Sequence, residues 1–482
     1  MQKKSITKNY IYNLSYQILI TLLPLITAPY ISRVLGPEGV GIYSYTSSMA
    51  SYFIIISVIG TNVYGQQIIA QFQDNHTRRS QLFWSVLQIR IICSLISIIS
   101  YLLIIINIDT NKSILLMFTI SIIANIFDIS WFFQGIEEFK NVVIRNFIFK
   151  LSITFSIFIF VKDKNDLTLY VLLSVLAIFV GNLSFWLNIK KYISTYYFDR
   201  AELFEHFKQT IVFFVPQVAI QLYSVSDRIM IGLITKSSEE NGYFDQSYKI
   251  INIAITVITS LNVVMRSRIS YLFAKHENLK IKEHLSTAIS FLCILAFPMM
   301  FGILACASDF VPLFFGPGYE ECIFLIRLFV PMIFLICFDS LLGIQYLTPI
   351  GKQKSCNKVL ITAAIINVVI NASLIPFYRS SGAIIASIVS EAFVVICYMS
   401  LSKEIITIPS LLRLSYKYIG ASLVMFISVK SITLFSLGHL ATILIQVIIG
   451  ILTYLLLLIL LRDQFVLSII NRFKFKRVKM IT

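Results

Sequence analysis

The sequence predicts an all-α integral membrane protein with about fourteen transmembrane helices, on three observations. Of the 482 residues, 57% are hydrophobic and 13% are charged, which is about half the charged fraction of an ordinary soluble domain. Stretches such as 91–107, 167–189 and 443–461 run for about 17–23 residues with almost no charge, the length that crosses a hydrocarbon core of about 30 Å. The basic residues behind the net charge of +16 separate these stretches instead of forming one solvated face, which argues against nucleic acid as a partner.

The predicted spans follow one another along the whole chain, separated by charged or Gly/Pro-containing breaks. They begin near residues 11, 41, 82, 113, 142, 167, 209, 246, 286, 322, 358, 381, 413 and 440. An even number of spans puts both termini on one side. The segments on that side hold 29 lysines and arginines against 8 on the other, so the positive-inside rule predicts cytoplasmic termini.

The second half of the chain resembles the first, which predicts two lobes. An apolar helix with Pro24 runs into Arg33-Val34-Leu35-Gly36 before a glycine opens the next span, and a helix with Pro216 runs into a similar Arg-to-Gly segment at 228–232. Arg-x-x-Gly helix ends also recur by chance. Two six-helix halves of equal orientation would pack about an axis along the membrane normal and enclose a central cavity.

The predicted organisation follows from this repeat and from the polar connection after span six. We expect an N-lobe over 1–190 (spans 1–6), a cytoplasmic linker over 191–207, a C-lobe over 208–402 (spans 7–12), spans 13–14 over 403–462 and a basic cytoplasmic tail over 463–482.

Ionisable residues inside the spans are the candidate functional residues. Such groups cost several kcal/mol in a membrane unless they face a cavity or a partner. As a set they predict a hydrated substrate cavity, although a buried ion pair that fixes helix register would explain any single one. They are Arg90, Asp128, Asp227, Arg228, Arg327, Asp339 and Glu391.

The sequence contains no arrangement typical of catalysis or of metal binding. It has no nucleophile elbow and no glycine-rich phosphate loop, its seven cysteines include no CxxC pair, and its five histidines are not paired at metal-ligand spacing. We therefore expect no catalytic residue, metal or cofactor. A membrane glycosyltransferase or polysaccharide polymerase is the alternative from another class, but such enzymes usually need an extended exterior loop.

Several motifs resemble those of Wzx-type polysaccharide flippases. The most specific is the run 128–140, DISWFFQGIEEFK, followed by Arg145, Asn146 and Lys150, which looks like the junction of the fourth and fifth spans in that family. Further runs similar to the family are 33–39 with Gly41 and Tyr43, Tyr223 with 227–232, 315–319 and 351–354. The family belongs to the superfamily of multidrug and toxin extrusion transporters and lipid II flippases, built as two six-helix bundles that face a central cavity.

The resemblance implies transport of undecaprenyl-diphosphate-linked oligosaccharide repeat units. These would move by alternating access from the inner to the outer leaflet of the bacterial plasma membrane, for assembly of O-antigen, capsule or exopolysaccharide. It also implies membrane lipids, a polysaccharide polymerase and a chain-length regulator as partners. A lipid II flippase of the same superfamily is the nearest alternative, whereas a drug exporter would typically stop at twelve spans.

The predicted cargo assigns roles to the cationic residues. Arginine binds phosphate oxygens through two parallel hydrogen bonds, so Arg90, Arg228 and Arg327 are the best-placed ligands for a diphosphate. A second set lies at the cytoplasmic ends of spans and is predicted to capture the anionic head group from the inner leaflet. Ordinary positive-inside anchoring explains that set equally well. It consists of Arg145, Lys150, Arg266 and Arg268.

Overall fold

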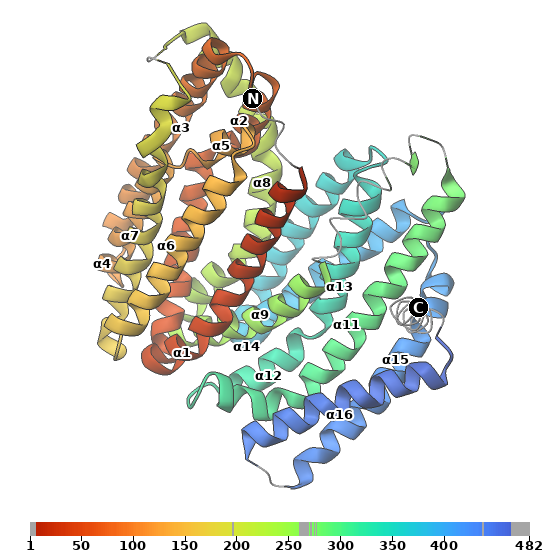
Figure 1. Cartoon of the computed structure of the whole chain (residues 1–482). Helices are drawn as coiled ribbons and strands as arrows, with labels where there is room; N and C mark the ends of the chain where they lie inside the picture. Colours follow the sequence, from red (N-terminus) through yellow and green to blue (C-terminus); the bar gives the residue numbers. More distant parts are fainter. Residues whose placement is uncertain are drawn as a thin grey trace, which may run out of the picture. The chain divides into compact units, whose positions relative to one another are not determined.

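The computed structural model describes residues 6–194, 197–259, 269, 272–273, 275, 277–435 and 438–463. Throughout these ranges the regular structure is helical, and no strand occurs (Figure 1). The chain forms two compact units, Met1–Gly242 and Tyr243–Thr482. The lobe and linker boundaries expected from the sequence stay a prediction.

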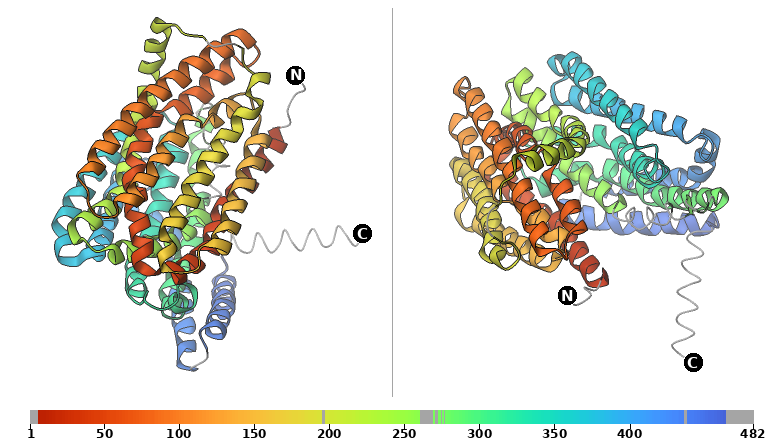
Figure 2. Two further views of the ribbon diagram at one scale, coloured as in Figure 1. Left: turned by 90° about the vertical axis from the view of Figure 1, so that its left-hand side faces the viewer. Right: turned by 90° about the horizontal axis from the view of Figure 1, so that it is seen from above.

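The first unit is built from eight α-helices and two short 3-10 helices, and α9 begins at its end. Figure 2 shows several of these helices, coloured red to yellow, running alongside one another. The elements of this unit in chain order are α1 (Ile6–Val58), α2 (Thr61–Gln71), α3 (His76–Ile106), α4 (Lys112–Ile126), α5 (Ser130–Gly135), α6 (Phe139–Phe160), η1 (Lys164–Asp166), α7 (Leu167–Leu183), η2 (Ser184–Lys191), α8 (Arg200–Thr235) and the start of α9 (Ser238–Thr259).

The second unit continues from α9 and contains long helices with one π-helical turn. Its elements are α11 (Asn278–Phe314), α12 (Glu321–Phe329), α13 (Pro331–Ser340), η3 (Leu341–Leu347, π-helical), α14 (Gln353–Leu401), α15 (Ile408–Ser431), η4 (Ile432–Phe435) and α16 (His439–Leu460).

Ten stretches of the described chain are long and apolar enough to cross a membrane. Two of them, Leu23–Gln71 and Gln353–Leu401, have 49 residues each, about twice what one crossing needs. Each bends inside at a non-helical residue, Gly36 (φ 70°) or Arg379 (φ 50°). Counting each as two spans gives twelve candidate crossings among the described residues. The predicted all-α membrane fold is confirmed.

Helix α3 shows how the helices meet lipid. Its outward stripe is apolar yet exposed, with Ile92, Leu95, Ile96, Ile99 and Leu103 each 47–60% accessible, spaced at three and four residues. Its opposite face is buried. A helix that is apolar on its exposed face as well as its buried face is typical of a membrane span.

Two glycines fix a close contact between α1 and α9. A Cβ atom added to Gly41 would lie 1.6 Å from the carbonyl oxygen of Ser238, and one added to Gly242 would lie 2.1 Å from that of Pro37. Only a residue without a side chain fits such an approach of two backbones. Both glycines open spans in the two motifs that suggested the internal repeat.

Candidate functional site

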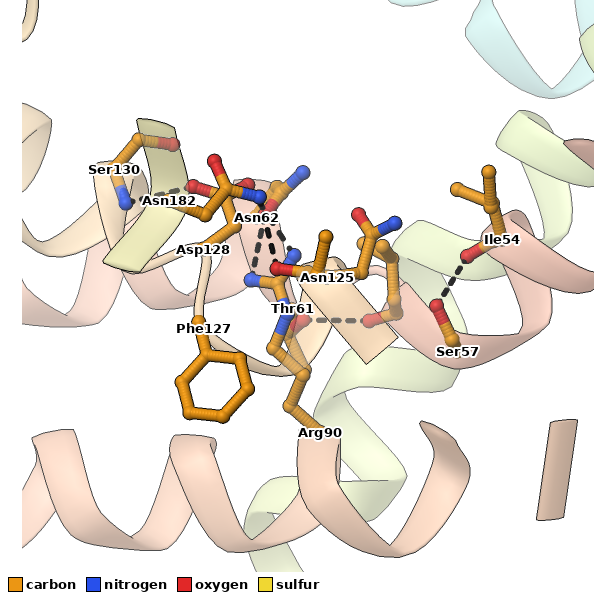
Figure 3. Close-up of polar contacts among 12 residues, drawn as sticks. Ile54, Ser57, Thr61, Asn62, Arg90, Asn125, Phe127, Asp128, Ser130 and Asn182 are labelled. Atoms are coloured by element: carbon orange, nitrogen blue, oxygen red, sulfur yellow. Dashed lines mark hydrogen bonds and ion pairs between the residues drawn. The ribbon is translucent and has the colours of Figure 1, made fainter. Parts of the chain in front are cut away.

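A buried arginine at the middle of α3 is the centre of a polar network in the first unit. Arg90 is fully buried. Its Nη1 donates to Asn62 Oδ1 of α2 at 2.9 Å, and its Nη2 lies 3.4 Å from Asp128 Oδ2, as Figure 3 shows. Two elements that are far apart in sequence therefore supply the acceptors for one guanidinium group.

Asp128 is placed by a break between α4 and α5. Helix α4 ends at Ile126, and Asp128 Oδ1 accepts the backbone N–H of Ser130, the first residue of α5, at 2.9 Å. One carboxylate oxygen thus caps a helix start while the other faces Arg90. Asn182 of α7 donates to the carbonyl oxygen of Ala124 at 2.8 Å. The indole N–H of Trp186, in η2, donates to the carbonyl oxygen of Phe127 at 2.9 Å. The Ala124 carbonyl oxygen also accepts the backbone N–H of Phe127, so both bonds tie the end of α4 to neighbouring elements.

The network borders a cavity of about 450 Å³ inside the first unit, between α1, α6, α7 and the α4–α5 connection. The Asp128 side chain is 18% accessible and lines this cavity, whereas Arg90 lies behind it and does not. The polar side chains that line the cavity are those of Thr27, Tyr43, Asp128, Ser130, Asn146, Lys150, Thr154, Tyr170, Ser174 and Asn182. We call it the Asp128 cavity.

Lys150 brings a positive charge to the Asp128 cavity from α6. It is partly buried, and no carboxylate of the described residues forms an ion pair with it. The cavity therefore combines one anionic and one cationic group with neutral hydroxyl and amide groups. Such a lining suits a ligand that carries both phosphate and sugar hydroxyl groups.

In the second unit, an apolar groove of about 760 Å³ lies between α11, α15 and α16. Its walls include Phe291, Leu295 and Met299 of α11. Of its polar side chains, Tyr454 donates to the carbonyl oxygen of Ile294 at 3.0 Å and Gln446 contacts Asp309. The groove itself is thus suited to a hydrocarbon chain.

Residues 6–270 match the family model described as "Polysaccharide biosynthesis protein", which is more than half of the chain. The chain belongs to this family. A protein of Escherichia coli (strain K12) named "Putative O-antigen transporter" is 26% identical over 405 residues, covering 81% of this chain and 95% of that protein.

Two solved structures share the fold of this polysaccharide biosynthesis family member. The lipid II flippase MurJ in its inward closed conformation is similar with a TM-score of 0.77 and 17% identity, covering 95% of this chain and all of that one. An inward-facing multidrug resistance MATE transporter of the MOP superfamily has a TM-score of 0.62 and 16% identity, covering 82% of this chain and 98% of that one. The polysaccharide family predicted from the sequence is thus confirmed, and these two structures show that its fold is shared.

The structure brings some of the predicted site residues of this family member together. Arg90 pairs with Asp128. In the second unit, Asp339 of α13 and Glu391 of α14 lie near enough for their charges to interact, and Glu391 is buried. The two groups come from helices that pack against each other.

Other predicted residues lie on other helices. Asp227 and Arg228 are on α8 in the first unit, and Arg327 is on α12 in the second. Among the four head-group residues, Lys150 lines the Asp128 cavity while Arg145 lines a different pocket. Arg266 and Arg268 lie outside the described residues, so their role stays a prediction.

The sequence reasoning did not identify Asn146, Tyr43 and Tyr170 as lining residues. Single polar or aromatic residues in apolar helices carry no periodic signal that separates a cavity wall from a helix contact. For metals, the described residues contain no group of three or more His, Cys, Asp or Glu side chains that could hold an ion.

Proposed function

We propose that this chain is a flippase that moves undecaprenyl-diphosphate-linked oligosaccharide repeat units from the inner to the outer leaflet of the bacterial plasma membrane, for surface polysaccharide assembly. The observation that carries the proposal is the alignment of 81% of the chain with 95% of a relative named as an O-antigen transporter. The matching family model is described by polysaccharide biosynthesis, which points to the same cargo class.

The geometry supports the proposal because each part of such a cargo has a chemically suitable surface. Hydroxyl and amide groups of the Asp128 cavity can exchange hydrogen bonds with sugar hydroxyls, and Lys150 can attract a phosphate oxygen. The apolar groove of the second unit can cover part of the polyprenyl chain. Arg90 fixes the Asp128 carboxylate at the cavity wall and is in this proposal a positioning residue.

We further propose alternating access with both termini in the cytoplasm. The kinks at Gly36 and Arg379 divide long helices into two arms each, and such breaks are where the helices of a transporter can change direction. The excess of basic residues on the predicted inner side supports this orientation. A polysaccharide polymerase and a chain-length regulator would act on the flipped product.

Lipid II is the second candidate cargo, because the fold matches MurJ over 95% of the chain. At 17% identity that likeness carries the fold and not the cargo. A polymerase or glycosyltransferase remains the alternative from another class. We propose transport rather than catalysis because the similar proteins are named as transporters.

The test is deletion and rescue with labelled lipid-linked intermediates. In a strain lacking this chain, repeat units should accumulate on the inner leaflet, and only the intact protein should clear them. Units that reach the outer leaflet unaided but fail to polymerise would instead identify an assembly enzyme. Rescue of a strain depleted of its lipid II flippase would identify lipid II as the cargo.

A further inference from the structure

A pocket of about 570 Å³ opens in the first unit beside the start of α6, separate from the Asp128 cavity. From η2 it receives Ser184, Asn188 and Lys191, and from α6 it receives Arg145. Phe149 lines this pocket and the Asp128 cavity alike, so its ring is part of the wall between them. We call the new pocket the Arg145 pocket.

Among the residues that the structure describes, no carboxylate pairs with the cations of the Arg145 pocket. Arg145 Nη1 is buried and makes no hydrogen bond to the described residues. The carbon at the centre of its guanidinium group lies 4.3 Å from the centre of the Phe185 ring, a cation–π contact that holds the group in place. No described carboxylate forms an ion pair with either Arg145 or Lys191. A buried donor of positive charge without a partner is costly, and an anionic ligand would remove that cost.

Neutral donors complete the polar side of the pocket. Asn188 offers an amide and Tyr192 a phenol group. Burial raises the pKa of Tyr192, the charge of Glu138 raises it further, and the charge of Arg79 lowers it. The phenol therefore keeps its proton at neutral pH and can donate it in a hydrogen bond. Arg79 holds this segment in place, because its Nη2 donates to the Tyr192 carbonyl oxygen at 2.8 Å. Glu138 is a nearby acid whose charge contributes to the raised pKa of Tyr192.

The other side of the pocket is apolar and faces outward. Ile144 and Ile148 line it and are 42% and 53% accessible. They lie four residues apart on the exposed face of α6, which meets lipid in a membrane span. A small soluble anion would make no use of this apolar face, whereas a lipid would place its phosphate under the cations and its first methylene groups along the isoleucines.

We infer that the Arg145 pocket binds the phosphate group of an anionic lipid that enters sideways from the bilayer. The shared chemistry is a lipid-attached phosphate, and it has two sources: an anionic phospholipid of the bilayer, or a polyprenyl diphosphate carrier. With the carrier as source the inference rests on the proposed function and deepens it, whereas with a bilayer phospholipid as source it goes beyond that function.

The test is native mass spectrometry of the purified full-length protein with defined lipids. The probes are phosphatidylglycerol, phosphatidylcholine and undecaprenyl diphosphate, each offered at the same concentration. We compare the wild type with Arg145→Gln and Lys191→Gln. The matched control is Lys190→Gln, because Lys190 is an exposed neighbour that does not line the pocket.

The wild type should retain an anionic lipid at least 5-fold better than phosphatidylcholine. Each pocket variant should weaken that retention about 5-fold or more, and Lys190→Gln should stay within 2-fold of the wild type. If undecaprenyl diphosphate is the probe that depends on Arg145 and Lys191, the source is the carrier. If phosphatidylglycerol depends on them instead, the source is the bilayer.

Two outcomes would overturn the inference. One is equal retention of phosphatidylcholine and both anionic probes by the wild type. The other is unchanged binding in Lys191→Gln, which alters an exposed side chain and therefore keeps the test valid if Arg145→Gln fails to fold. Loss or retention of flipping activity does not enter either criterion, so this inference and the proposed function can fail separately.

Discussion

Replacing Arg90 by methionine should destabilise the first unit by about 3 kcal/mol. At 3.4 Å and an effective dielectric constant of about 20, the gross attraction between Arg90 and Asp128 is about 5 kcal/mol. Desolvation of the buried guanidinium offsets most of it, so the intact pair contributes little net stability. The variant is costly for another reason: it leaves the Asp128 carboxylate and Asn62 Oδ1 without their donor. Removal of one partner of a buried pair costs about 3–5 kcal/mol, and the partial exposure of Asp128 favours the lower end.

A double-mutant cycle separates the pair from its surroundings. Asp128→Asn alone should also cost about 3 kcal/mol, since it leaves a buried cation unpaired, whereas the double variant Arg90→Met with Asp128→Asn should cost only about 2 kcal/mol. The measurement is the free energy of unfolding of the purified proteins in detergent micelles. Additive single-variant losses, or an Arg90→Met protein within about 0.5 kcal/mol of the wild type, would refute the reasoning.

Three further predictions concern single substitutions in the described part of the chain. Lys150→Gln should reduce cargo flipping about 10-fold or more, while the thermal midpoint stays near that of the wild type, since among the described residues Lys150 is the only cation that lines the Asp128 cavity. Gly242→Ala should destabilise the protein by about 1–3 kcal/mol because the new Cβ would meet a backbone carbonyl oxygen at 2.1 Å; Gly420→Ala, with nothing within 4 Å of its Cβ, is the control and should be neutral or slightly stabilising. Tyr64→Phe should cost about 1–2 kcal/mol in unfolding measurements, because it breaks the buried hydrogen bond between the hydroxyl and His206 Nδ1, and a value near zero would contradict this.

The sequence predicts the helices of this protein well because the membrane imposes their length and composition. The span predicted to begin near residue 381 follows the kink at Arg379, and the one predicted near 41 follows the kink at Gly36. Breaks of this kind need glycine, proline or charged residues, which are visible in a single chain. Helix positions could therefore be derived from hydropathy and charge alone.

The partners of the buried charges could not be derived in the same way. Arg90 and Asp128 both stand out as charges within spans, but Asn62, the second acceptor for Arg90, does not. Which helices touch depends on packing between segments that are distant in sequence. Arg145 and Lys150 are five positions apart on α6, close to one and a half turns, so they project in different directions and line different pockets.

The contact of Gly41 and Gly242 between α1 and α9 has a mechanical consequence. Backbone lies against backbone there. Parting the two helices at this point would require no rotamer change by either glycine and would rupture no side-chain hydrogen bond of theirs. Separating the helices would lose dispersion energy and weak Cα–H···O attraction, which are individually small and fall off within fractions of an ångström. A helix contact made by two glycines can therefore form and separate at a small cost in energy.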